Sequence, residues 1–192
     1  MPRLLRLEYE NAWHHVMNRG ACRQNTFLDP DDRQRFLDLL GDSTERAGVE
    51  VHGYCLMNNH YHLLVRTPTP ALGRTMQLLA GRYTRYFNHR HSRDGALFRG
   101  RYRSKAVESD GQLLATLRYI HRNPTNDFEV HPDDYLWSSQ RPYRELVAPS
   151  PWLHTKELLS IAGGADGFAS LIYSPLGDEA SAATLPDGWV AA

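Results

Sequence analysis

Cysteine is scarce in this chain, which has two cysteines among 192 residues. Cys22 and Cys55 lie far apart and form no Cys-x-x-Cys pair, so the sequence indicates neither a zinc ribbon nor a disulfide-stapled secreted fold. A chain of this length builds one domain whose core needs no such support. We therefore expect a protein of a reducing compartment.

Long apolar runs are also missing. No stretch reaches the roughly 18 to 20 apolar residues that cross a membrane. The N-terminal segment MPRLLRLEYENAWHH carries charges where a signal peptide has its apolar run. We expect a cytoplasmic protein without a membrane partner.

The chain has no net charge, which argues against indiscriminate binding of polyanions, but its charges are unevenly distributed. Nine basic residues lie between Arg74 and Lys105 against the single acid Asp94, a local excess of eight positive charges. No basic residue follows Lys156. A concentrated basic surface is typical of proteins that bind phosphate backbones, although a merely solvated charged face is an equal alternative.

Apolar periodicity predicts an α+β fold. Asp29 and Pro30 begin the first helix and Gly48 ends it. Pro124 ends the third, because the residue before proline disfavours helical geometry. The expected elements are strand 12–18, helix 30–47, strands 51–57 and 60–65, helix 70–88, strand 97–107, and helices 109–123 and 155–162. The first six match the ferredoxin-like split βαβ arrangement, an antiparallel sheet with helices on one face.

A pair of histidines is the first candidate site. His60 and His62 are two residues apart on a predicted strand, so both imidazoles share one face and Tyr61 points away. They can share one metal ion, or they can simply hydrogen bond at a strand edge. Metals used in phosphoryl chemistry also need an oxygen ligand.

The helix before Pro124 offers an oxygen ligand and a nucleophile. Tyr119 and Asn123 are four residues apart and lie on one face. A different face carries the apolar stripe that anchors the helix to the sheet, made of Leu113, Leu117 and Ile120. Spacing alone leaves open that Tyr119 is an ordinary, partly buried aromatic.

At these residues the sequence resembles a known family. MNNHYHLLV resembles the HUH motif, and LRYIHRNP the tyrosine helix, of REP-associated tyrosine transposases and other single-tyrosine HUH transposases. Further similar segments occur in the family's order: HVMNRG, the stretch from Asn25 to Asp29, Asn88 to His91, LFRGRYRS and YLWSS. The resemblance implies a catalytic domain at 8–145, a C-terminal helical extension at 146–173 beside it, and a disordered acidic tail at 174–192.

The resemblance also implies roles for single residues. His60, His62 and Asn123 would hold Mg²⁺ or Mn²⁺, and Tyr119 would attack single-stranded DNA beside a hairpin, a REP-like palindrome, and remain joined to the 5′-phosphate. Asn123 stands where related enzymes have glutamine, and Tyr61 where an aliphatic residue is more usual. The expected DNA contacts are Arg19, Gly20, Arg82, Arg85, Arg99, Arg101, Arg103 and Lys105. A monomer or homodimer associated with the bacterial nucleoid is implied.

Two alternatives remain at this level. A domesticated hairpin-binding protein would keep the fold without cleaving DNA. A small metal hydrolase would use His60 and His62 with a water nucleophile, but neither histidine has an adjacent acidic residue to act as general base.

Overall fold

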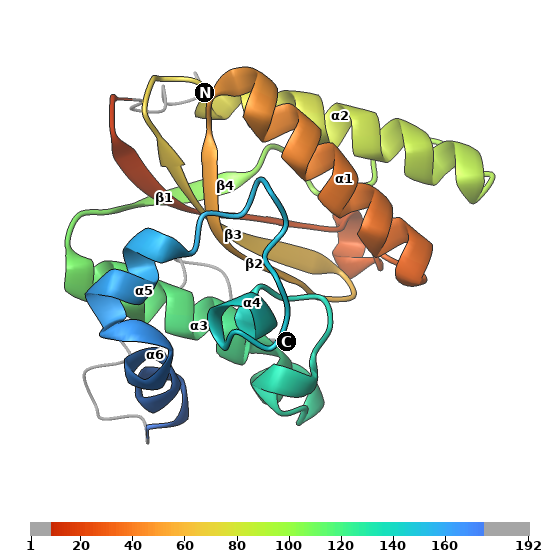
Figure 1. Cartoon of the computed structure of the whole chain (residues 1–192). Coiled ribbons are helices and arrows are strands. Elements are labelled where there is room, and N and C mark those ends of the chain that lie inside the picture. The colour runs from red at the N-terminus through yellow and green to blue at the C-terminus, as the bar shows by residue number, and fades with distance from the viewer. Residues whose placement is uncertain (1–8, 175–192) are drawn as a thin grey trace.

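The computed structural model describes residues 9–174, and this part of the chain folds into one sheet flanked by helices (Figure 1). The elements are β1 (Ala12–Arg19), η1 (Ala21–Arg23), α1 (Pro30–Ala47), β2 (Glu50–Leu56), β3 (His60–Thr67), α2 (Leu72–Arg90), β4 (Arg103–Val107), α3 (Asp110–Phe128), η2 (Pro132–Asp134), α4 (Gln140–Tyr143), α5 (Lys156–Ala162) and α6 (Gly164–Tyr173).

The sheet has the predicted ferredoxin-like topology. Among the described residues it contains four strands in the order β2-β3-β1-β4, and each neighbouring pair is antiparallel. β1 and β2 therefore run parallel with β3 between them, and β3 and β4 run parallel with β1 between them. These are the two split βαβ units that the sequence predicts.

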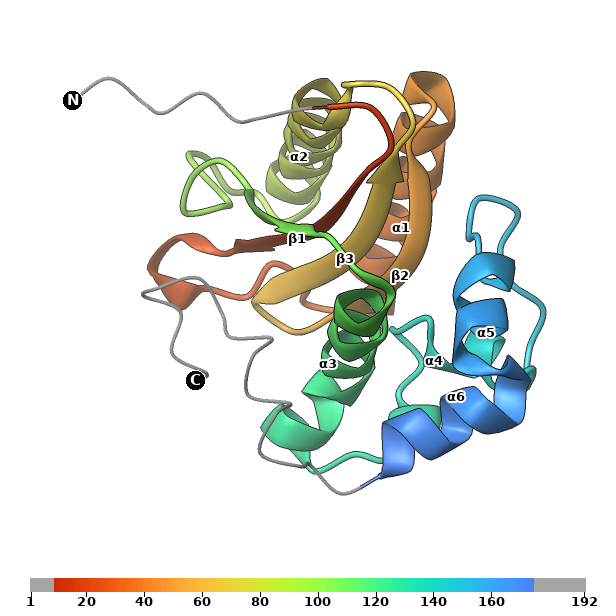
Figure 2. The ribbon, with the colours of Figure 1, turned by 90° about the vertical axis from the view of Figure 1, so that its left-hand side faces the viewer.

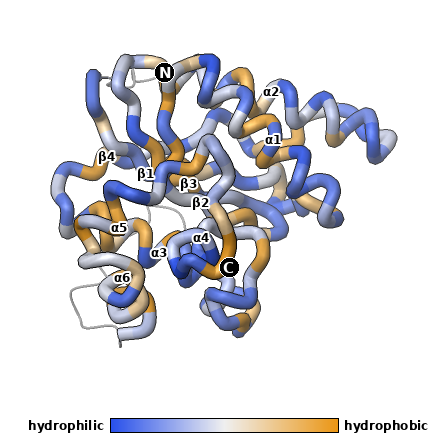
Figure 3. Tube along the Cα trace, in the orientation of Figure 1, coloured by the Kyte–Doolittle hydropathy of each residue, from blue (hydrophilic) through white to orange (hydrophobic). Residues whose placement is uncertain are grey.

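Helices α1 and α2 cover one face of the sheet, as expected (Figure 2). Their apolar sides meet the strand residues Tyr61, Leu63 and Val65 in a core that includes Phe36 and Tyr83. Hydropathy alternates along both helices, as it does in helices with one buried side (Figure 3). The cap of α1 is also as predicted: Asp29 accepts a hydrogen bond from the Asp32 amide, and Gly48 ends the helix at a φ of 65°.

Helix α3 covers the opposite face, so helices lie on both sides of the sheet. The stripe of Leu113, Leu117 and Ile120 is buried, as predicted, against β2 and β3. The close approach of α3 to the sheet depends on Gly53 of β2, because a Cβ there would lie 2.7 Å from a methyl carbon of Leu117. The helices α5 and α6 pack on α3 in turn, through Leu158, Phe168 and Ile172 among others.

The predicted strand 97–107 is wrong in its first half, because β4 begins at Arg103. Phe98 forms an isolated bridge with Gly20, and residues 99–101 form a bend. The alternation that predicted a strand over residues 97–102 has another cause. Phe98 and Tyr102 insert into the core beneath α1 and α2, while Arg99 and Arg101 stay exposed.

The predicted end of α3 at residue 123 is also wrong. The helix passes through Pro124 and ends at Phe128, with Glu129 as a left-handed cap. A proline within a helix loses one backbone hydrogen bond and usually bends or breaks it. Here the Pro124 ring is buried, and the Glu129 amide donates to the Thr125 carbonyl. The extra turn carries Asp127, on the same side of the helix as Tyr119 and Asn123.

Three expectations concern the ends and the surroundings of the chain. No helix within residues 9–174 is long and apolar enough to cross a membrane. The division into a domain at 8–145 and an extension at 146–173 stays a prediction. The predicted disordered tail, apart from Ser174, lies outside the described residues.

Candidate active site

His60 and His62 lie on the face of β3 that α3 covers, and their ring centroids are 5.1 Å apart. Both side chains are buried. Tyr61 points to the opposite face, where its ring packs 4.8 Å from that of Phe36. The strand therefore presents two imidazoles together, as its alternation predicts.

Tyr119 stands over this pair. Its ring lies 5.4 Å from the His62 ring at an interplanar angle of 87°, and 5.7 Å from the His15 ring. The apolar stripe of α3 sets this position, because it holds the helix on the sheet while Tyr119 lies beside the stripe. The sequence-predicted nucleophile and the two histidines are thus brought together.

Asn123 follows Tyr119 by one helical turn and contacts both Tyr119 and His60. Its Nδ2 donates to the Tyr119 carbonyl oxygen at 2.8 Å. Its side chain also hydrogen bonds to His60, which partly offsets the lowering of the His60 pKa by burial. All four residues of the predicted site therefore lie in one contact network.

Burial keeps the imidazoles neutral. It lowers the pKa of His60 to about 4 and that of His62 well below its usual value, and the neighbouring Arg19 cation adds to both effects. A neutral imidazole has one nitrogen with a lone pair, which is the form that binds metals. At neutral pH both side chains are in that form.

The tautomer of His60 follows from its neighbour Asn59. The Asn59 Nδ2 donates to the Arg23 carbonyl at 3.2 Å, so the Asn59 Oδ1 is the atom that lies 2.7 Å from His60 Nδ1. An amide oxygen only accepts, so Nδ1 of His60 carries the hydrogen. The lone pair of His60 is then on Nε2, as metal binding through that atom requires.

Tyr119 is protonated in the absence of a bound cation. Burial raises its pKa, nearby Asp127 adds to the rise, and Asn123 and Arg19 oppose it. Ionising this phenol at neutral pH therefore needs a further positive charge close by. Two neutral imidazoles and an amide beside it fit a divalent cation such as Mn²⁺ or Mg²⁺.

The predicted DNA-binding residues divide between two surfaces. Arg103 and Lys105 of β4 pair across the sheet with Met17 and His15 of β1 and so share the face of His60 and His62. Arg19 pairs with His60, and Arg99 donates its amide to the Arg19 carbonyl. Gly20 is the residue after Arg19 in the chain, and a Cβ at Gly20 would lie 2.1 Å from the Gln24 carbonyl oxygen. Arg101 is exposed in the adjoining turn.

Arg82 and Arg85 lie on α2, on the other side of the sheet. Arg82 forms an ion pair with Asp42 of α1, so its charge is already compensated within the protein. The structure does not bring these two arginines to the histidine face. Their role as DNA contacts stays a prediction.

Two residues near Tyr119 were not among the sequence-based candidates. His15 of β1 lies with its Nε2 2.9 Å from His62 Nδ1, a contact that depends on the pairing of β1 with β3. Asp127 interacts electrostatically with Tyr119 and Arg19. The sequence did place Asp127 at helical spacing from Tyr119 and Asn123. Because the helix was expected to end before Pro124, Asp127 was not assigned to it.

Comparison with known proteins decides the family. The family model described as "Transposase IS200 like" matches residues 8–123, more than half of the chain. The protein belongs to the IS200-like transposase family. No curated protein matches the chain in sequence.

Two solved structures resemble this transposase. A REP-associated tyrosine transposase bound to a REP hairpin matches with a TM-score of 0.62 and 16% identity, over 80% of this chain and 92% of that one. A Deinococcus radiodurans protein provisionally classed as a transposase matches with a TM-score of 0.44 and 18% identity, over 58% of this chain and 91% of that one. At this identity the first likeness shows the fold, and the family membership identifies a DNA-processing enzyme.

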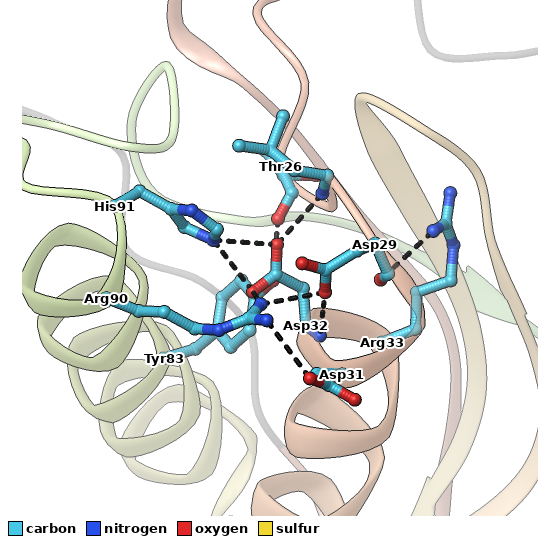
Figure 4. A network of polar contacts seen from close by, with 9 residues as sticks. Thr26, Asp29, Asp31, Asp32, Arg33, Tyr83, Arg90 and His91 are labelled. Atoms are coloured by element: carbon cyan, nitrogen blue, oxygen red, sulfur yellow. Dashed lines mark hydrogen bonds and ion pairs between the residues drawn. The ribbon is translucent and has the colours of Figure 1, made fainter.

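The transposase also has an acidic cluster away from Tyr119 (Figure 4). Asp29, Asp32 and His91 offer ligand atoms within 4.8 Å of one another, as a metal site would. However, Arg90 donates to Asp29 and Asp32 at 2.7 Å each, and His91 Nε2 lies 2.9 Å from Asp32. The guanidinium already supplies the positive charge, so the cluster ties the start of α1 to the end of α2.

An apolar hollow of about 390 Å³ adjoins Tyr119 on the outer side of α3. Leu114 and Ala115 of α3 and Leu171 of α6 line it. Arg118 and Arg122 also line it, and both donate to the Ser174 carbonyl. The hollow offers space for a flat ring beside Tyr119.

Proposed function

We propose that this transposase is a metal-dependent endonuclease that cleaves single-stranded DNA beside a hairpin and rejoins strands through a 5′-phosphotyrosine. The observation that carries the proposal is the ring of Tyr119 standing over His62, with His60 and Asn123 in the same network. A buried phenol next to two neutral imidazoles combines a nucleophile with metal ligands.

The chemistry is an exchange of phosphate esters. Tyr119 Oη attacks phosphorus, its bond to phosphorus forms as the bond to the 3′-oxygen breaks, and the phenolic proton is balanced by one taken up at that 3′-oxygen. A metal held by His60, His62 and Asn123 would supply positive charge to the phosphate. Asn123 restrains the Tyr119 end of α3 through its bond to the Tyr119 carbonyl. A later 3′-hydroxyl reverses the step, so rejoining needs no nucleotide cofactor.

One tyrosine allows one covalent intermediate per chain at a time. A full exchange of two strands therefore takes two chains, as in a homodimer, or two successive events in a monomer. Both schemes use the same site.

The proposed substrate is single-stranded DNA that forms a palindromic hairpin with an unpaired flank. The proposed place of action is the bacterial nucleoid. The solved REP-associated transposase with this fold binds a REP hairpin. Basic residues near the histidine face support phosphate contacts. The full proposed set of DNA contacts, including the surface on α2, is Arg19, Gly20, Arg82, Arg85, Arg99, Arg101, Arg103 and Lys105.

A covalent-adduct assay tests the proposal. Purified protein is incubated with Mn²⁺ and labelled hairpin oligonucleotides, and protein-linked DNA is resolved on a denaturing gel. We expect an adduct from the wild type, none from Tyr119→Phe, and equal hairpin binding by both. Tyr135→Phe is a matched control, because Tyr135 is also partly buried, and its hydroxyl donates to the Leu56 carbonyl outside the site.

The same assay separates the alternatives. A hairpin-binding protein that does not cleave would give no adduct with any of the hairpins, and this outcome would refute the proposal. A hydrolase that uses water would cleave without forming an adduct and would keep its activity in Tyr119→Phe.

A further inference from the structure

His15 is a buried histidine that the proposed chemistry does not use. It lies on β1, and its Nε2 is 2.9 Å from the Nδ1 of His62 on the neighbouring strand. The two rings are 5.1 Å apart at 33°, and the His15 ring also packs 5.7 Å from Tyr119. The side chain is therefore in direct contact with both a proposed metal ligand and the proposed nucleophile.

The contact has two possible hydrogen placements, with opposite consequences. If His15 donates from Nε2, neutral His62 accepts at Nδ1 and carries its own hydrogen on Nε2, where it blocks metal binding. If His62 donates from Nδ1, its lone pair is on Nε2, and the ligand is ready. His60 shows the second pattern, since its Nδ1 donates to Asn59 Oδ1.

We propose that His15 is a positioning residue for His62, accepting the Nδ1 hydrogen and so directing the Nε2 lone pair of His62 to a divalent metal. The inference rests on the proposed function. The 2.9 Å separation of His15 Nε2 and His62 Nδ1 supports it, because the two atoms lie close enough to share one hydrogen.

Three substitutions of His15, whose side chains differ in length and in hydrogen-bonding capacity, test the proposal. In His15→Gln, the amide oxygen reaches about as far from the backbone as imidazole Nε2 and can accept the same hydrogen. In His15→Asn, the same amide is one bond shorter and stops short of His62. In His15→Phe, the ring packing against Tyr119 is kept and the acceptor is lost.

The main measurement is Mn²⁺ affinity at neutral pH without DNA, from the electron paramagnetic resonance signal of free Mn²⁺. We expect His15→Phe and His15→Asn to bind Mn²⁺ about 10 to 100 times more weakly, as for other partners of metal-bound histidines, and His15→Gln to stay near the wild type. Hairpin affinity without metal should be unchanged in all three variants.

A control variant and thermal melting separate this role from general stability. His52→Phe removes another buried histidine, one whose ring packs 4.3 Å from that of Trp13 at a tilt of 55°, and should leave Mn²⁺ affinity unchanged. A purely structural role for His15 would lower the melting temperature of the variants but leave the Mn²⁺ affinity of the folded protein intact.

The outcomes distinguish the inference from the proposed function. Wild-type affinity in His15→Phe, or equal losses in His15→Gln and His15→Phe, overturns the role of His15 while the covalent adduct of the wild type still stands. A wild type that neither binds Mn²⁺ nor forms an adduct overturns the proposed function and the inference together.

Discussion

Tyr119 of α3 and His62 of β3 meet with their rings nearly perpendicular, 5.4 Å apart. The contact joins two elements that are distant in the chain and lies on the sheet face opposite α1 and α2. It places the phenol next to an imidazole whose pKa is lowered by burial. The protonation states of these two side chains give the first prediction.

The rate of adduct formation should rise with pH. Burial holds the Tyr119 pKa above its usual value in the metal-free protein, and a bound cation lowers it, so with Mn²⁺ the phenolate fraction grows about tenfold per pH unit below the metal-bound pKa. His60, with a pKa of about 4, stays neutral above pH 6, so its titration does not change the rate in this range. Single-turnover rates between pH 6 and 9 at saturating Mn²⁺ measure this. A flat profile, or a decline above pH 7, would contradict it.

Acid should unfold the protein more readily than its net charge suggests. Burial lowers the pKa of five histidines below the ordinary value of 6.5, to about 4 for His15 and His60, to about 3 for His52 and His121, and well below that value for His62. The unfolded chain takes up these protons first, so the free energy of unfolding is constant above about pH 7 and falls as the pH drops from about 6.5 toward 4.

Circular dichroism against pH measures that loss. Removing one such group in His52→Phe should reduce the slope by about one proton and move the acid midpoint to lower pH. Unchanged stability between pH 7 and 4 in the wild type would show that these imidazoles titrate normally in the folded protein.

Charges on the histidine face should contribute to DNA binding. Lys105 is exposed on β4, two strands from His62, and Arg103 is partly exposed beside it. We expect Arg103→Ala and Lys105→Ala each to weaken hairpin binding and to reduce the slope of log affinity against log salt by about one. Arg82→Ala should change both less, because Asp42 already compensates Arg82. Equal effects at all three positions would instead favour a hairpin that reaches both surfaces.

The acidic cluster at the start of α1 should affect stability and not metal binding. Asp32 is fully buried, and its carboxylate accepts from Arg90 and from the Leu28 amide. Breaking such a pair costs about 3 kcal/mol, so Asp32→Asn should lower the free energy of unfolding by that amount. The exposed Asp31, which contacts the same arginine, gives Asp31→Asn as the control, with a change within about 0.5 kcal/mol.

Chemical denaturation and Mn²⁺ titration together check this assignment. Asp32→Asn should keep wild-type Mn²⁺ affinity once folded. A loss of Mn²⁺ binding in this variant would move the metal site from His60 and His62 to the acidic cluster.

Local patterns determined a large part of this protein. The first helix follows from the Asp29 cap and Gly48, and strand alternation puts His60 and His62 on one face. Helical spacing puts Asn123 one turn from Tyr119. These features depend on residues within a few positions of one another, so the sequence contains the information directly.

Tertiary structure decided the rest. The contact of His15 with His62 depends on which strands pair, and the start of β4 at Arg103 depends on the core taking up Phe98 and Tyr102. The passage of α3 through Pro124, which brings Asp127 to the site, occurs in a helix packed against the sheet and against α5 and α6. Each outcome is set by contacts between segments far apart in the chain, where packing outweighs local conformational preference.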